Sequence, residues 1–185
     1  MPEEVQLRIS TKRIAFAVAI IVIVAAFYFS YPYISYNLFP ITHYNYYGTQ
    51  LDFRSDLKEA QKMPVYPNEA LIVDTVFNPF VQNLPVVFQD TSQNSLVYVE
   101  AYEIGYKMRT AYLTINRQVN INSRVVNFTE QGMLINPVIV LVPPVLANET
   151  SVRVSNFTVI ISAKTLKEFD LVTDKFLMVA MGIKV

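Results

Sequence analysis

The uncharged apolar run from Ile14 to Phe29 constrains this chain more than any other feature. It reads IAFAVAIIVIVAAFYF and carries about five-sixths of the summed hydropathy of the chain. As a helix it would be about 24 Å long, and extension through Ile34 gives about 31 Å, enough to cross the hydrocarbon core of a bilayer. Because lipid offers no hydrogen-bond partners to a backbone, a lone span has to be helical. We therefore expect one transmembrane helix over residues 14–34.

The basic residues around this run set its orientation. Arg8, Lys12 and Arg13 precede it, and the next lysine or arginine is Arg54. The excess of positive charge on one side predicts a cytoplasmic tail over residues 1–13, a juxtamembrane linker over 35–43 and an extracytoplasmic domain over 44–185. We therefore expect a single-pass protein of the cell membrane. A cleaved secretory signal and a pilin-like assembly helix remain as alternatives.

Charge and composition exclude several functions. The chain has 15 basic and 15 acidic residues and no cysteine. Without a basic block it is a poor candidate for binding nucleic acid. Without cysteine it has no disulfide, no thiolate nucleophile and no cysteine-based zinc site. The expected partners are the lipid bilayer and a protein of the cell envelope.

Periodicity beyond residue 44 predicts alternating strands and helices. The expected strands or hairpins cover 44–53, 84–89, 120–128, 137–142, 152–155 and 157–162, and the expected helices cover 56–62, 70–77, 96–114 and 165–181. The apolar run 137–142 is typical of a strand in the middle of a sheet. For the last helix, Thr165 and Glu168 predict a capping box and Gly182 predicts the C-cap.

The segment 96–114 decides the fold class. Its valines and tyrosines favour a strand, but its apolar residues follow a helical stripe: Val97, Ala101, Ile104, Met108, Ala111 and Tyr112. As a helix it predicts an α/β or α+β domain, with a mixed sheet covered by helices. As strands it would give the alternative, an all-β sandwich of immunoglobulin-like or cupredoxin-like type.

Several short stretches resemble an uncharacterised family of archaeal single-pass membrane proteins. These stretches are Phe53-Arg54-Ser55-Asp56-Leu57-Lys58-Glu59-Ala60 with Pro64-Val65-Tyr66-Pro67, Val99-Glu100-Ala101-Tyr102-Glu103-Ile104, and the C-terminal unit ending in Asp174-Lys175-Phe176. The resemblance implies an α/β domain and no particular activity.

The titratable residues give no catalytic or metal site. His43, the only histidine, is expected to be solvated or interfacial. Asp170 and Asp174 form a like-charged i, i+4 pair that we interpret, with the lysines around it, as a solvated helix face. Glu100 and Glu103 are likewise expected on an outer face, with Glu103 paired to Lys107, and the alternative is that they are buried acids on an inward-facing side of the helix. We predict no catalytic residue, no metal and no cofactor.

Three glycosylation sequons follow the apolar run. Their asparagines are Asn127, Asn148 and Asn156. All three would lie on the outer side of the membrane, which makes them candidate N-glycosylation sites. Together these observations predict a non-enzymatic interaction or scaffold protein of the envelope. The alternatives are an accessory subunit of a respiratory or other membrane complex, and an exported hydrolase or small-ligand binder.

Overall fold

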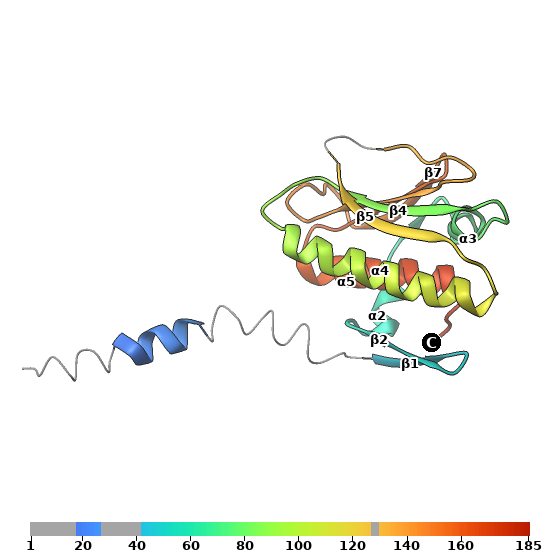
Figure 1. Cartoon of the computed structure of the whole chain (residues 1–185). Helices are drawn as coiled ribbons and strands as arrows, with labels where there is room; N and C mark the ends of the chain where they lie inside the picture. Colours follow the sequence, from blue (N-terminus) through green and yellow to red (C-terminus); the bar gives the residue numbers. More distant parts are fainter. Residues whose placement is uncertain (1–17, 27–41, 127–129) are drawn as a thin grey trace, which may run out of the picture. The chain divides into compact units, whose positions relative to one another are not determined.

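The computed structural model describes residues 18–26, 42–126 and 130–185 (Figure 1). The chain divides into two compact units, Met1–Pro40 and Ile41–Val185. Residues 18–26 are helical, and the rest of the expected span 14–34 lies outside the described residues. Within the described ranges, no helix is both long and apolar enough to cross a membrane.

A six-stranded sheet forms the centre of the second unit. Its strand order is β3-β7-β8-β6-β4-β5, and only β7 and β8 are antiparallel neighbours. The strands are β3 (Val65–Tyr66), β4 (Asn83–Phe88), β5 (Asn120–Val125), β6 (Val138–Val142), β7 (Ser151–Ser155) and β8 (Thr158–Ser162). The two-residue β3 closes one edge, and the six-residue β5 forms the other.

Strand periodicity divides the apolar side chains between the two faces of this sheet. Leu84, Val86 and Phe88 of β4 belong to the main core, while Val87 lies in a smaller cluster on the opposite face, with Val138 and Val140 of β6. Both faces of these strands are therefore buried. This burial explains why β4 and β6 read as continuous apolar runs in the sequence.

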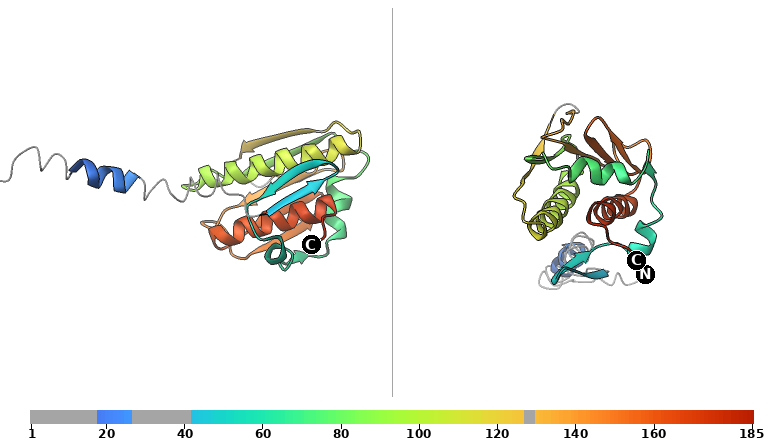
Figure 2. Two further views of the ribbon diagram at one scale, coloured as in Figure 1. Left: turned by 90° about the horizontal axis from the view of Figure 1, so that it is seen from below. Right: turned by 90° about the vertical axis from the view of Figure 1, so that its right-hand side faces the viewer.

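Two long helices, α4 (Asn94–Thr114) and α5 (Leu166–Met181), lie side by side on the main core face of the sheet (Figure 2). Two short helices, α2 (Leu57–Ala60) and α3 (Ala70–Val76), pack against α5. The side chain of Thr165 accepts a hydrogen bond from the backbone N–H of Glu168, and Gly182 ends α5 in the left-handed conformation. The predicted N-cap and C-cap residues are confirmed, but of the expected capping box only the Thr165 half forms, and the Glu168 carboxylate accepts a hydrogen bond from Thr150 Oγ1 at 2.8 Å.

An antiparallel hairpin covers the side of α4 and α5 that faces away from the sheet (Figure 2). Its strands are β1 (Thr42–Tyr46) and β2 (Thr49–Phe53), and Tyr47 and Gly48 turn between them with positive φ. Leu51 and Phe53 insert into the main core. The helices are therefore buried between two β layers, which changes the environment of their polar residues.

The structure confirms an α/β domain with a mixed, mostly parallel sheet. The all-β alternative is wrong because residues 94–114 form one helix. The apolar stripe of this helix, at the spacing of every third or fourth residue, is fully buried against the core. Burial of the stripe outweighs the strand preference of the valines and tyrosines within it.

Two glycines give opposite stability predictions. Gly105 lies inside α4, and a Cβ there would meet only Ile121 Cγ2, at 3.9 Å. Gly105→Ala is expected to raise the free energy of unfolding by about 0.5–1 kcal/mol, because alanine loses less entropy in a helix. At Gly132 a Cβ would lie 1.9 Å from the carbonyl oxygen of Phe157. Gly132→Ala should therefore lower the free energy of unfolding by roughly 1–3 kcal/mol. Denaturant titration of the full chain measures both changes, and an equal effect of the two substitutions would contradict this packing.

Candidate functional site

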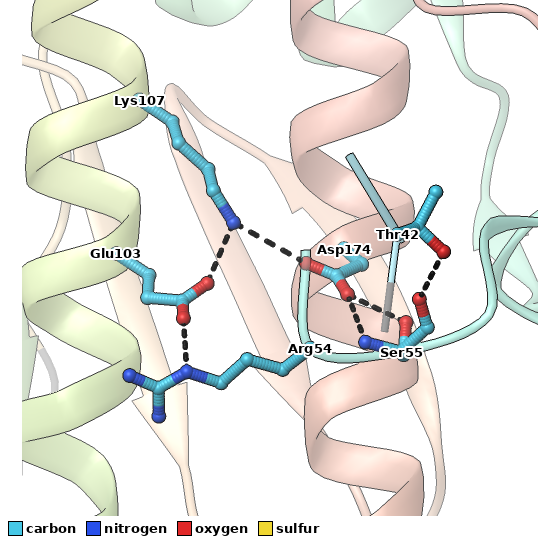
Figure 3. A network of polar contacts seen from close by, with 6 residues as sticks. All are labelled: Thr42, Arg54, Ser55, Glu103, Lys107 and Asp174. Atoms are coloured by element: carbon cyan, nitrogen blue, oxygen red, sulfur yellow. Dashed lines mark hydrogen bonds and ion pairs between the residues drawn. The ribbon is translucent and has the colours of Figure 1, made fainter. Parts of the chain in front are cut away.

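A cluster of charged residues lies beneath the hairpin, where β2, α4 and α5 meet (Figure 3). Arg54 and Ser55 follow β2, Glu103 and Lys107 lie one turn apart on α4, and Asp174 lies on α5. Lys107 and Asp174 are each only 2% exposed. We call these five residues the ionic cluster.

Lys107 is the centre of the ionic cluster. Its Nζ lies 2.6 Å from Glu103 Oε2, 3.8 Å from Asp174 Oδ1 and 4.0 Å from the centre of the Phe53 ring. The other Glu103 oxygen, Oε1, pairs with Arg54 Nε. One buried cation thus joins two carboxylates and an aromatic face, which compensates for much of its lost hydration.

Asp174 ties the hairpin to α5. Its Oδ2 accepts hydrogen bonds from the Ser55 backbone N–H, at 3.1 Å, and from Ser55 Oγ, at 2.5 Å. Thr42 Oγ1 in turn donates to the Ser55 carbonyl oxygen at 3.2 Å. The two Ser55–Asp174 hydrogen bonds join residues 119 positions apart in the chain, so they fix where the hairpin lies on the helix pair.

Burial also changes the acidity of this carboxyl group. Removal from water raises the pKa of Asp174 to about 7, against the lowering effects of Lys107 and the Ser55 donors. The neutral form is favoured by desolvation, and the ionised form by the cation and the hydrogen bonds. Asp174 therefore titrates near neutral pH inside the folded domain.

Most of the ionic cluster is buried beneath the hairpin, with Arg54 half-buried, and this burial limits what the cluster can do chemically. A catalytic acid or base has to reach a proton on a substrate. Neither of the two grooves described below is lined by a member of the cluster. The geometry therefore assigns the cluster a structural role, the fixing of the hairpin on α4 and α5.

The larger groove, of about 920 Å³, lies between α4 and the edge strand β5. Its α4 wall carries Tyr102, Tyr106, Arg109 and Leu113, at i, i+4, i+7 and i+11 along one helix face. Tyr102 is 71% exposed, and its ring stacks on that of Tyr106 with centroids 6.4 Å apart. We call this surface the α4–β5 groove.

The second groove, of about 720 Å³, lies beside the C-terminus of α5. Lys175 lines it, and its Nζ donates to the Gln61 carbonyl oxygen at 2.8 Å and pairs with Glu69 Oε1 at 2.6 Å. The charge of this lysine is thus already compensated by the protein.

The lining of the α4–β5 groove is cationic and contains no aspartate or glutamate. Arg117 is committed to the fold, because its guanidinium donates to the carbonyl oxygens of Phe77, Pro79 and Val81. Arg109 is exposed, and its guanidinium makes no ion pair or hydrogen bond with any other residue of the described ranges. The groove therefore lacks the pair of carboxylates that a hydrolase site of that type requires. An anionic group could instead pair with Arg109.

The structure corrects the placement of three predicted surface acids. Glu100 and Glu103 are 2% and 8% exposed rather than on an outer face. Asp174 is buried rather than solvated, while Asp170 is half-buried. The hairpin explains the difference, because it covers the side of α4 and α5 that would otherwise face water. The predicted pairing of Glu103 with Lys107 is confirmed.

The single histidine is exposed, as expected. His43 lies on β1, and its Nδ1 is 2.6 Å from Asp52 Oδ1, a contact that lowers the pKa of the Asp52 carboxyl group. In the described part of the chain, no group of three or more histidine, aspartate or glutamate side chains is placed to hold a metal ion.

Two of the three predicted sequon asparagines lie on the surface. Asn148 is exposed in the loop before β7, and Asn156 is exposed in the turn between β7 and β8. Asn127 lies outside the described residues. Glycosylation of these residues remains a prediction.

Comparison with known proteins gives no match. No family model, curated protein or solved structure matches the chain. Function therefore has to follow from the chemistry of the ionic cluster and of the α4–β5 groove. Of the two, the groove is the one whose side chains can meet a ligand.

Sequence reasoning missed both sites for different reasons. The groove had a local signal, since tyrosines 98, 102 and 106 recur every fourth residue and place aromatic rings along one side of the helix. The ionic cluster had a local signal only for its Glu103–Lys107 pair, because Ser55 and Asp174 meet only when the hairpin folds onto α5. Local spacing reveals a helix face, but it does not reveal what covers that face.

Asp174 predicts a particular pH dependence of stability. Its folded pKa, about 7, lies above the ordinary value of 3.8 for an aspartate, so the folded state binds more protons between these values and stability falls as pH rises through that window. Asp174→Asn should flatten the fall between about pH 4 and about pH 7, as measured by denaturant unfolding. An identical pH dependence in the wild type and the variant would contradict a buried, titrating Asp174.

Removal of the central cation should be costly. Lys107→Met leaves two buried carboxylates without their shared partner, and we expect the free energy of unfolding to fall by about 3–5 kcal/mol. The matched control is Lys167→Met, which removes an exposed ion pair with Glu59. This control should change the free energy of unfolding by less than about 1 kcal/mol. Equal effects in thermal and denaturant unfolding would show that the cluster does not hold the hairpin.

Proposed function

We propose that this chain is a single-pass membrane protein whose extracytoplasmic domain binds a protein partner in the cell envelope, and that it carries out no catalysis of its own. The α4–β5 groove is the binding surface in this proposal. It is the observation that carries the proposal, because it combines exposed aromatic rings, an unpaired cation and an open sheet edge in one place.

The side chains of the groove are those that protein interfaces use. Tyrosine gives a large contact area at a low cost in conformational entropy and keeps a polar end for hydrogen bonding. Tyrosine and arginine are also the residues most often found where binding energy concentrates. Tyr102, Tyr106 and Arg109 present both types on one helix face.

The rest of the molecule supports binding rather than catalysis. The buried acids and Lys107 serve to fix the hairpin, and the groove brings no pair of acids together. The apolar run 14–34 and the basic residues before it support the membrane location. A subunit of a larger membrane complex would use the same surface, and a stable co-purifying complex is what distinguishes that arrangement from a transient contact.

Co-purification of the full chain tests the proposal. The chain is extracted from its native membrane in mild detergent, and the partner is identified from the wild type. In the double variant with Tyr102→Ala and Tyr106→Ala, we expect the recovered partner to fall at least tenfold, because the aromatic wall of the groove is lost.

Tyr47→Ala is the matched control, because Tyr47 is an 81% exposed tyrosine on the hairpin turn, outside the groove. This variant should retain the partner at the level of the wild type. Recovery of the wild-type chain without any partner, or equal retention by the double variant, would overturn the proposal.

A further inference from the structure

The outer edge of β5 presents main-chain hydrogen-bonding groups to the α4–β5 groove. The amides of Asn120 and Val126 donate to the carbonyl oxygens of Gln82 and Phe88, toward β4. Since successive residues of a strand point their backbone groups to opposite sides, the amides and carbonyls of Ile121, Ser123 and Val125 point away from β4. No strand in the described ranges pairs with this outer edge.

The edge strand lies beside the tyrosine face of α4. Ile121 Cγ2 lies next to Gly105, whose missing side chain leaves space between helix and strand. Along the same helix face follow Tyr102, Tyr106 and Arg109. A chain laid along β5 would therefore have main-chain partners on one side and aromatic and cationic side chains on the other.

We infer that the α4–β5 groove takes an extended segment of the partner protein, which adds as a further strand to β5 and places an acidic side chain on Arg109. This inference rests on the proposed function and names the chemistry of its partner. Strand addition of this kind derives affinity from main-chain hydrogen bonds and specificity from the alternate side chains of the guest.

The positive charge of the groove favours an acidic side chain on the guest segment. Arg109 has no carboxylate among the groove residues to pair with, and Arg117 is engaged with three backbone carbonyls. A carboxylate can bind a guanidinium through two parallel hydrogen bonds, which gives direction as well as attraction.

The length of β5 sets the size of the guest. Six residues at about 3.3 Å each give an edge of about 20 Å, which a guest segment of five or six residues would cover. A small ligand would leave most of the outward main-chain groups of β5 unused, whereas an extended peptide would use those of Ile121, Ser123 and Val125.

Selection from a random twelve-residue peptide library, with the full chain immobilised in mild detergent, tests this inference. The enriched peptides should carry an aspartate or glutamate at a fixed position within a β-forming stretch. The strongest of them is then synthesised with that acidic residue or with its amide, and its Kd is measured. The amide form is expected to bind at least tenfold more weakly.

Two pairs of variants separate the contributions of charge and backbone. Arg109→Gln should weaken binding of the acidic peptide at least tenfold, whereas Arg124→Gln should not, because Arg124 is an exposed arginine of the same strand that pairs with Glu130 and does not line the groove. Ser123→Pro removes one outward amide and should weaken binding at least tenfold, whereas Ser123→Ala removes only the hydroxyl and should not.

The outcomes distinguish this inference from the proposed function. Peptides that require Tyr102 and Tyr106 but tolerate both Arg109→Gln and Ser123→Pro would overturn strand addition while leaving the groove as the binding surface. Enriched helical peptides, or self-association of the chain through β5 without a peptide, would also overturn it. Peptides that bind independently of the two tyrosines would overturn both the inference and the proposed function.

Discussion

Lys107 makes the buried contacts on which the architecture of this domain depends. Buried between β2, α4 and α5, it contacts Glu103, Asp174 and the ring of Phe53. A lone cation could not occupy this position, because its desolvation would cost far more than packing returns. The surrounding carboxylates are therefore as necessary as the lysine, and together they join the hairpin to both long helices.

This arrangement gives α4 three environments. One face, which includes Ile104 and Met108, packs in the main core, and a second, with Glu103 and Lys107, lies beneath the hairpin. The third carries Tyr102, Tyr106 and Arg109 along the α4–β5 groove. Because two faces are fixed by burial, the rotation of the helix is fixed as well. The residues of the third face are thus held in position beside β5, which would lower the entropic cost of binding the proposed partner.

The sequence predicted the elements of the fold better than their surroundings. The apolar run of β6, the stripe of α4 and the caps of α5 depend on neighbouring residues, and the structure confirms all three. The burial of Asp174 depends on Ser55, which lies 119 positions away. Charge at helical spacing normally indicates a solvated face, and here the hairpin covers that face. The α4–β5 groove was in principle predictable from the tyrosine spacing, but its edge strand becomes evident only from the order of the sheet.

Amide hydrogen exchange, resolved by residue in the full chain with and without a saturating selected peptide, tests the strand addition most directly. The outward amides of Ile121, Ser123 and Val125 should exchange at least tenfold more slowly when the peptide is bound, and the amides of the hairpin should not change. Unchanged exchange at these three amides in the saturated complex, with protection confined to other parts of the domain, would contradict the pairing of a partner strand with β5.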